Sequence, residues 1–163
     1  MDVILVQDAA IDEYMSQVLL TTMPVKLLGV SIVNADCIDT AAMQAAWNIN
    51  TYIGATAMPL GLSRARGWNP FPWPYRTDCI NEGKIAALAG IPENSSWPPY
   101  PDGDAMLEAW LTACEPGVTV LVTCPFTPLS NVLKRRPLLK KKIGQIVWMG
   151  GAIGVPEIGR AHV

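Results

Sequence analysis

The chain has 163 residues, half of them hydrophobic, and 12 basic residues against 14 acidic ones, for a net charge of −2. This length suffices for one domain with a substantial core, and the charge balance gives no electrostatic footprint for nucleic acid or an anionic membrane. The four cysteines are widely spaced and form no Cys-x-x-Cys pair, which argues against a cysteine-based zinc site. For Cys37, Cys114 and Cys124, buried free thiols in a reducing compartment are the simplest interpretation.

No apolar run reaches the length of a membrane span, and Met1 is followed directly by Asp2 and an apolar strand. The sequence therefore predicts neither a membrane anchor nor a secretory signal, and it favours a cytoplasmic location.

Three carboxylates follow the first predicted strand, residues 3–6. Asp8 comes two residues after it, and Asp12 and Glu13 open a segment with helical spacing. Aspartate at a helix cap and acids in a first turn, which favour the helix dipole, would explain Asp12 and Glu13 without any function. They do not explain Asp8. The carboxyl end of a strand is the usual ligand site of an open α/β sheet, so a site is the alternative.

A second strand is predicted over residues 25–33, and it ends in a polar turn that contains Asn34 and Asp36. A helix should follow from about Asp39 and stop at Gly54. Residues 58–62 predict a third short strand, which Pro59 places at a sheet edge or a strand start.

Residues 63–101 contain two clusters of tryptophan, proline and arginine, with one short helix predicted near residues 81–89. Prolines forbid regular ladders, and a loop of this length inside a domain tends to be functional. Arg64, Arg66 and Arg76 among aromatic side chains could stack on nucleic acid. We favour a packed loop whose arginines pair with nearby carboxylates, because the chain has no net basic charge. A protein-interaction surface is a further alternative.

The rest of the chain continues the alternation of strands and helices. Helices are predicted over residues 104–114 and 130–139, the second with a basic solvated end, and strands over residues 119–123 and 143–149. This order predicts a mostly parallel, open α/β sheet. Because the carboxyl ends of parallel strands share one edge, five polar residues are expected to converge there. They are Asp8, Asp12, Asn34, Asp36 and Thr123.

Four segments in order along the chain carry a further signal, residues 6–13, 27–36, 121–127 and 146–152. Together they resemble four landmarks of the inosine/uridine-preferring nucleoside hydrolases. The family's hallmark is a strand followed by Asp-x-Asp-Pro-Gly-x-Asp-Asp, and residues 6–13 stand in its place. The resemblance implies the family fold, with helices on both faces of the sheet. It also implies hydrolysis of ribonucleosides to base and ribose by a calcium-bound water.

For the metal, the resemblance implies three residues. Asp8 would bind calcium and take a proton from the attacking water. Glu13 stands at the place of a calcium-binding aspartate, and Thr123 would offer its backbone carbonyl. These are the oxygen donors that calcium prefers.

For the substrate, the resemblance places Asp12 at the ribose hydroxyls and Met149 in the pocket. Asp36 aligns without a gap with a ribose-contacting asparagine, and the nearby Asn34 is the alternative equivalent. The implied partner is a small nucleoside, with a homo-oligomer possible for the full-length protein and no nucleic acid or membrane.

Three departures from the hallmark leave a second function open. Val6 replaces its first aspartate, Ala9 and Ala10 replace Pro-Gly, and Glu13 is one methylene longer than aspartate. The loss of glycine removes a residue suited to special backbone angles. A non-catalytic module that binds ribose or calcium is therefore the alternative.

The family fold is about twice as long as this chain, so residues 1–157 are expected to be the N-terminal part of a truncated hydrolase domain. The last six residues, 158–163, follow no structural pattern and are interpreted as a non-native tail. His162, the one histidine, lies in that tail and is not expected to be catalytic.

Overall fold

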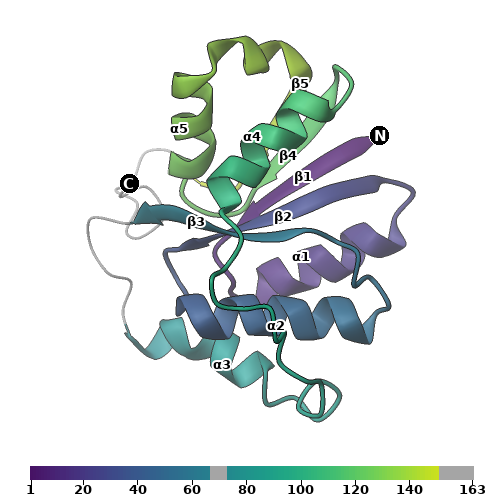
Figure 1. Ribbon diagram of the computed structural model, residues 1–163, viewed down its shortest axis with the longest axis vertical. Helices are drawn as coiled ribbons and strands as arrows, with labels where there is room; N and C mark the ends of the chain where they lie inside the picture. The colour runs from purple at the N-terminus through teal and green to yellow at the C-terminus, as the bar shows by residue number, and fades with distance from the viewer. Residues whose placement is uncertain (67–72, 151–163) are drawn as a thin grey trace.

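A computed structural model gives the fold of residues 1–66 and 73–150. They form a parallel five-stranded sheet in the order β3-β2-β1-β4-β5 (Figure 1). The strands are β1 (Asp2–Gln7), β2 (Lys26–Asn34), β3 (Leu60–Arg66), β4 (Val118–Val122) and β5 (Ile143–Trp148). This confirms the predicted parallel α/β sheet. The tail at 158–163, with His162, lies outside the described residues.

Helices pack on both faces of the sheet, as expected (Figure 1). One face carries α1 (Ile11–Thr22), α2 (Asp39–Tyr52) and the short α3 (Asp78–Glu82), and the other carries α4 (Gly103–Ala113) and α5 (Thr127–Arg135). Two 3-10 helices complete the described elements, η1 (Trp73–Thr77) and η2 (Pro137–Lys142).

The position of β1 at the centre of the sheet explains why residues 3–6 are all apolar. Val3 and Leu5 belong to the core under α1 and α2, whereas Ile4 and Val6 belong to the core under α4 and α5. Successive side chains of a strand point to opposite faces, so a strand covered on both faces has no polar alternation.

The start of α4 is held tightly against β3. Asp102 caps the helix by accepting from the Asp104 and Ala105 N–H groups, and the Leu62 N–H donates to the Pro101 carbonyl at 2.8 Å. The buried Asp104 carboxylate accepts from the Ser63 hydroxyl at 2.6 Å. These hydrogen bonds fix the axis of α4 relative to the sheet.

The third strand lies later than the predicted residues 58–62, because β3 runs from Leu60 to Arg66. It is an edge strand, as Pro59 indicated, and its burial alternates, with Arg64 and Arg66 exposed. The two arginines obscured the pattern, although an edge strand keeps one face in water.

Two predicted helices have different bounds. The helix expected at residues 81–89 is wrong for most of that range, because α3 begins at Asp78 and ends at Glu82 before Gly83, a poor helix former. The helix expected at residues 130–139 begins earlier, as α5, and ends at Arg135 because Pro137 cannot continue it.

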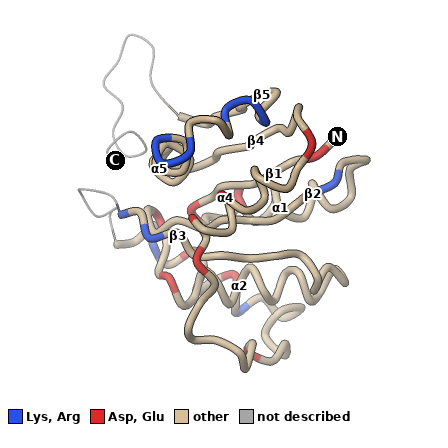
Figure 2. Tube along the Cα trace, turned by 45° about the horizontal axis from the view of Figure 1, so that its top comes forward, with Lys and Arg blue, Asp and Glu red and all other residues tan. Residues whose placement is uncertain are grey.

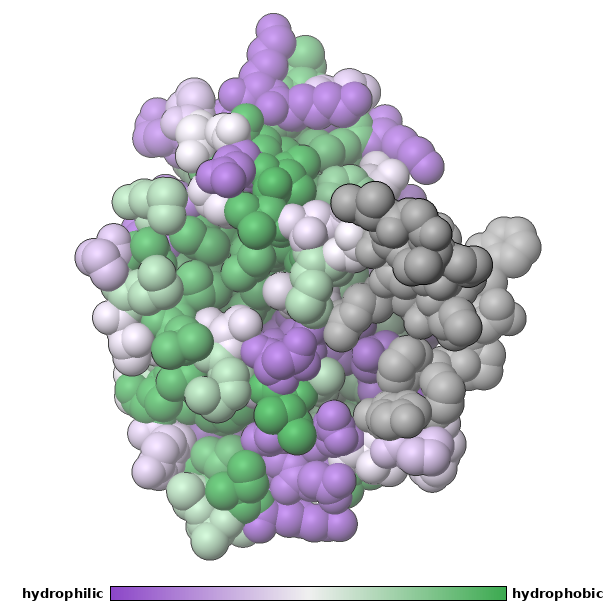
Figure 3. Space-filling view, turned by 180° about the vertical axis from the view of Figure 1, so that it is seen from behind, coloured by the Kyte–Doolittle hydropathy of each residue, from purple (hydrophilic) through white to green (hydrophobic). Residues whose placement is uncertain are grey.

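Several large apolar side chains are exposed on the face that carries α1, where Figure 3 shows a broad apolar surface. On α1 they recur every four residues and form one stripe, and on β5 they are consecutive, so neither side of that strand is fully covered. Contiguous exposed apolar surface is typical of sites that contact another protein or a ligand. The exposed residues are Ile11, Met15, Leu19 and Met23 around α1, and Ile146, Val147 and Trp148 in β5.

Basic side chains gather from the end of α5 through η2 (Figure 2). Arg135 and Arg136 approach Glu108 at 3.5 and 3.7 Å, and the Lys142 ammonium donates to the Cys114 carbonyl. The exposed pairs agree with a solvated basic helix end. None of the described helices is long and apolar enough to cross a membrane.

All four cysteines are buried free thiols, as predicted for Cys37, Cys114 and Cys124. Burial raises the pKa of Cys37 far above its usual range, with smaller contributions from Cys79, Asp39 and Asp8. In the unfolded chain this thiol ionises near pH 8.5, whereas in the folded chain it keeps its proton. The unfolded state therefore binds fewer protons, and the stability falls as pH rises above that value.

We expect Cys37 to lower the free energy of unfolding by about 2 kcal/mol between about pH 8.5 and pH 10. Urea titrations of the wild type and of Cys37→Ala at both pH values measure this. The variant should lose less stability over the interval. Equal losses in the two proteins would contradict the buried, neutral thiol.

Candidate functional site at the carboxyl edge of the sheet

The strand register brings the predicted site residues to one edge of the sheet. The Thr123 N–H donates to the Val6 carbonyl at 2.9 Å, and the Met149 N–H donates to the Val122 carbonyl at 2.8 Å. Asn34 ends β2, in register with Arg66 of β3. The residues that follow β1, β2, β4 and β5 therefore share the edge where α/β sheets bind ligands.

Asp8 follows β1 directly, and its exposed fraction is 0 %. Burial of a carboxylate is costly unless cations or hydrogen bonds offset it. The next residue, Ala9, has a φ of 67°, the left-handed region that favours glycine. Strained backbone of this kind clusters at functional sites.

Ala10 has an ordinary φ of −87°, so the glycine missing from the hallmark is not required there. The special angle falls instead at Ala9, where the hallmark has proline. Proline fixes φ near −65° and cannot adopt the observed angle. The loop therefore departs from the hallmark in its backbone as well as in its residues.

Replacing Ala9 tests this loop conformation. Ala9→Pro should lower the free energy of unfolding by about 3 kcal/mol or more, because the ring forbids a positive φ. Ala9→Gly should change it by less than about 1 kcal/mol, since glycine accepts the angle. Urea unfolding of both variants measures the difference, and a fully stable Ala9→Pro protein would contradict the observed backbone.

Glu13 and Asp12 occupy different surroundings in the first turn of α1. Glu13 is fully buried, and its Oε2 accepts from the Ala10 N–H at 3.1 Å, half of a capping box. Asp12 is exposed. Helix capping therefore accounts for one oxygen of Glu13. Asp12, by contrast, lies where a ligand could reach it from solvent.

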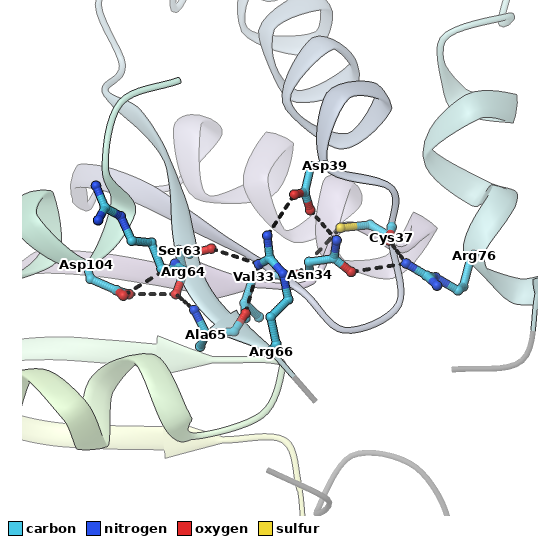
Figure 4. Close-up of polar contacts among 10 residues, drawn as sticks. All are labelled: Val33, Asn34, Cys37, Asp39, Ser63, Arg64, Ala65, Arg66, Arg76 and Asp104. Carbon is cyan, nitrogen blue, oxygen red and sulfur yellow. Dashed lines mark hydrogen bonds and ion pairs between the residues drawn. The ribbon is translucent and has the colours of Figure 1, made fainter. Parts of the chain in front are cut away.

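Asn34 is held at both ends of its amide, as Figure 4 shows. Its Nδ2 donates to Asp39 Oδ1, and its Oδ1 accepts from Arg76 at 3.1 Å. Arg76 also donates to the Cys37 carbonyl at 3.0 Å, and Arg66 pairs with the other Asp39 oxygen at 2.9 Å. Arg76 from η1 therefore holds the turn after β2, and Arg66 from β3 holds Asp39 at the start of α2.

Asp36, Thr123 and Met149 complete the predicted set. Asp36 and Thr123 are buried, and Met149 is 37 % exposed beyond the end of β5. Asp36 lies between Asn34 and Cys37, the two residues that Arg76 contacts, and is two positions from Asn34 in the sequence. The edge thus holds both candidates for the ribose-contacting position.

The sequence predicted only some of the contacts that Arg64, Arg66 and Arg76 make. Arg64 pairs with Asp102 at 3.0 Å and Arg66 with Asp39, which agrees with the expected pairing to carboxylates. Trp97 packs edge-on against Trp47 and Tyr100, as expected of a packed loop. The role of Arg76 at Asn34 was missed, because these residues are 42 positions apart and share no local pattern.

The donors at this edge fit calcium in type but not in number. Asp8, Glu13 and the Thr123 carbonyl offer only oxygen, which calcium prefers, whereas calcium takes six to eight ligands. Over residues 1–66 and 73–150, no three histidine, cysteine, aspartate or glutamate side chains gather in metal-binding geometry. A complete shell would need further oxygens from water, substrate or other protein groups.

Comparisons with known proteins bear on this fold. Over residues 3–161 the sequence matches the family model described as Inosine-uridine preferring nucleoside hydrolase. A nucleoside hydrolase of that name from Bacillus anthracis is 31 % identical, with a TM-score of 0.82, over 96 % of this chain and 54 % of that one. No curated protein matches.

Two more distant structures share the fold. A purine-preferring ribonucleoside hydrolase from Gardnerella vaginalis is 19 % identical (TM-score 0.77), over 95 % of this chain and 50 % of that one. A plant nucleoside hydrolase is 18 % identical (TM-score 0.75), over 99 % and 51 %. This chain therefore spans about half the length of the solved structures that it matches. It belongs to the inosine-uridine preferring nucleoside hydrolase family.

Proposed function

We propose that the whole protein hydrolyses the N-glycosidic bond of ribonucleosides, and that residues 1–157 supply the N-terminal part of its active site, with 158–163 a non-native tail. The observation that carries this proposal is the burial of Asp8 directly after β1, at the sheet edge where β2 ends in Asn34 and Thr123 follows β4. A buried carboxylate beside other strand ends is suited to acid–base chemistry.

Cleavage of this bond passes through an oxocarbenium-like state with positive charge on the ribose. Asp8 would accept a proton from the attacking water, and the carboxylates of the edge would stabilise the developing charge. Asp12, which is exposed, would hold the ribose hydroxyls, with Asn34 or Asp36 as a second contact and Met149 against the base.

We further propose calcium as the cofactor, held by Asp8, Glu13 and the Thr123 carbonyl. A bound metal ion lowers the pKa of its water and so supplies a nucleophile near neutral pH. Since this chain offers few of the ligands calcium needs, purified residues 1–163 should show little or no turnover. Measurable ribose release by them would contradict this.

The alternative is a non-catalytic module that binds ribose or calcium. The left-handed Ala9 and the longer Glu13 favour it, because the hallmark's proline cannot adopt the angle of Ala9 and its aspartate is one methylene shorter than Glu13. An assay of ribose release from inosine and uridine by the whole protein separates the two. Release supports the hydrolase, and ribose or calcium binding without release supports the module.

A further inference from the structure

We propose that Arg76 is a positioning residue that sets the orientation of the Asn34 amide for a ribose hydroxyl. This rests on the proposed function, because it names what presents one substrate contact. Arg76 itself touches no substrate in this account. It comes from η1, outside the strands that carry the site.

The first step is the geometry of the amide. Arg76 Nη2 donates to Asn34 Oδ1, and Asn34 Nδ2 donates to Asp39 Oδ1. A flipped amide would turn its N–H groups toward the guanidinium and its oxygen toward the carboxylate, so both contacts would become repulsive. One orientation is therefore selected. It leaves one N–H and one acceptor lone pair of Asn34 for a ligand, which matches a hydroxyl group.

The second step is the turn that carries this amide. The same Arg76 nitrogen donates to the Cys37 carbonyl at 3.0 Å, so one guanidinium spans residues 34–37. Asn34 and Asp36, the two candidate ribose contacts, both lie within this span. The Cys37 carbonyl thereby holds the guanidinium beside the Asn34 amide, and Arg76 acts on the site through that amide.

The third step is the comparison of the arginines. The Arg66 side chain, which pairs with Asp39, is 51 % exposed, and exposed pairs contribute little. Arg76 is less exposed and binds Asn34 directly. Arg64 is 82 % exposed and pairs with Asp102, at the start of α4. Arg64 is thus a control for loss of an arginine near the edge without loss of the Asn34 contact.

The test measures the dissociation constant for D-ribose in the whole protein. Arg76→Met should raise it about tenfold, since a charge-assisted hydrogen bond no longer orients the amide. Arg64→Met should leave it within about twofold. In an Asn34→Ala background, Arg76→Met should add less than about twofold, because the arginine acts through the asparagine. If Arg76→Met does not fold, Arg76→Lys should give a smaller loss of the same kind.

Side-chain amide resonances of Asn34, followed by NMR, read the orientation without a ligand. They should shift in Arg76→Met and not in Arg64→Met. Unchanged resonances, an unchanged dissociation constant, or a full Arg76 effect in the Asn34→Ala background would each overturn the inference. If the wild type binds no ribose while the Asn34 resonances shift as expected, the proposed function is wrong. Arg76 then orients the Asn34 amide without a role in ribose binding.

Discussion

Asp8→Asn is expected to lower ribose release by the whole protein about a thousandfold, the scale of a lost general acid–base group. Asparagine keeps the size of aspartate but cannot accept the proton of the attacking water. The substitution also removes a buried negative charge, so we expect the free energy of unfolding to fall by less than about 1 kcal/mol, or to rise.

Asp2→Asn is the matched control, because Asp2 begins the same strand at the opposite edge of the sheet. It should retain wild-type release. Steady-state kinetics on inosine with urea unfolding of the three proteins would separate loss of chemistry from loss of fold. An Asp8→Asn protein as active as Asp2→Asn would contradict the catalytic assignment.

Gly103→Ala is expected to lower the free energy of unfolding by about 3 kcal/mol, a large part of a typical total. A Cβ at Gly103 would lie 2.8 Å from the Leu62 carbonyl carbon, the Ser63 nitrogen and the Ser31 hydroxyl. Two of these are backbone atoms of β3, which cannot move aside. The start of α4 would be displaced, and the hydrogen bond between Ser63 and Asp104 would be broken.

Gly90→Ala is the control, since a Cβ there meets no atom within 4 Å. Its stability should equal or slightly exceed that of the wild type. Urea titration measures both variants. A Gly103→Ala midpoint equal to that of Gly90→Ala would show that α4 does not approach β3 this closely.

The sequence predicted those parts of the fold that rest on local patterns. The apolar run from Val3 to Val6 indicated a strand covered on both faces, and the polar residues after each strand indicated a shared edge. Strand direction then followed from the alternation with helices, since parallel strands need crossovers.

Features that depend on tertiary contacts could not be predicted in this way. Two adjacent alanines give no sign that Ala9 adopts a left-handed angle. The Arg76 contact joins segments far apart in the chain, and the exposed arginines of β3 obscured its strand pattern. Contacts between distant segments of the chain leave no pattern in the local sequence.

The most direct test of the account is ribose release from inosine by the whole protein, measured before and after removal of calcium by a chelator. The account predicts release that is lost on chelation and restored by added calcium, since Asp8 and Glu13 would then regain their ion. Release that persists without calcium would contradict the metal assignment, and no release in its presence would contradict the hydrolase.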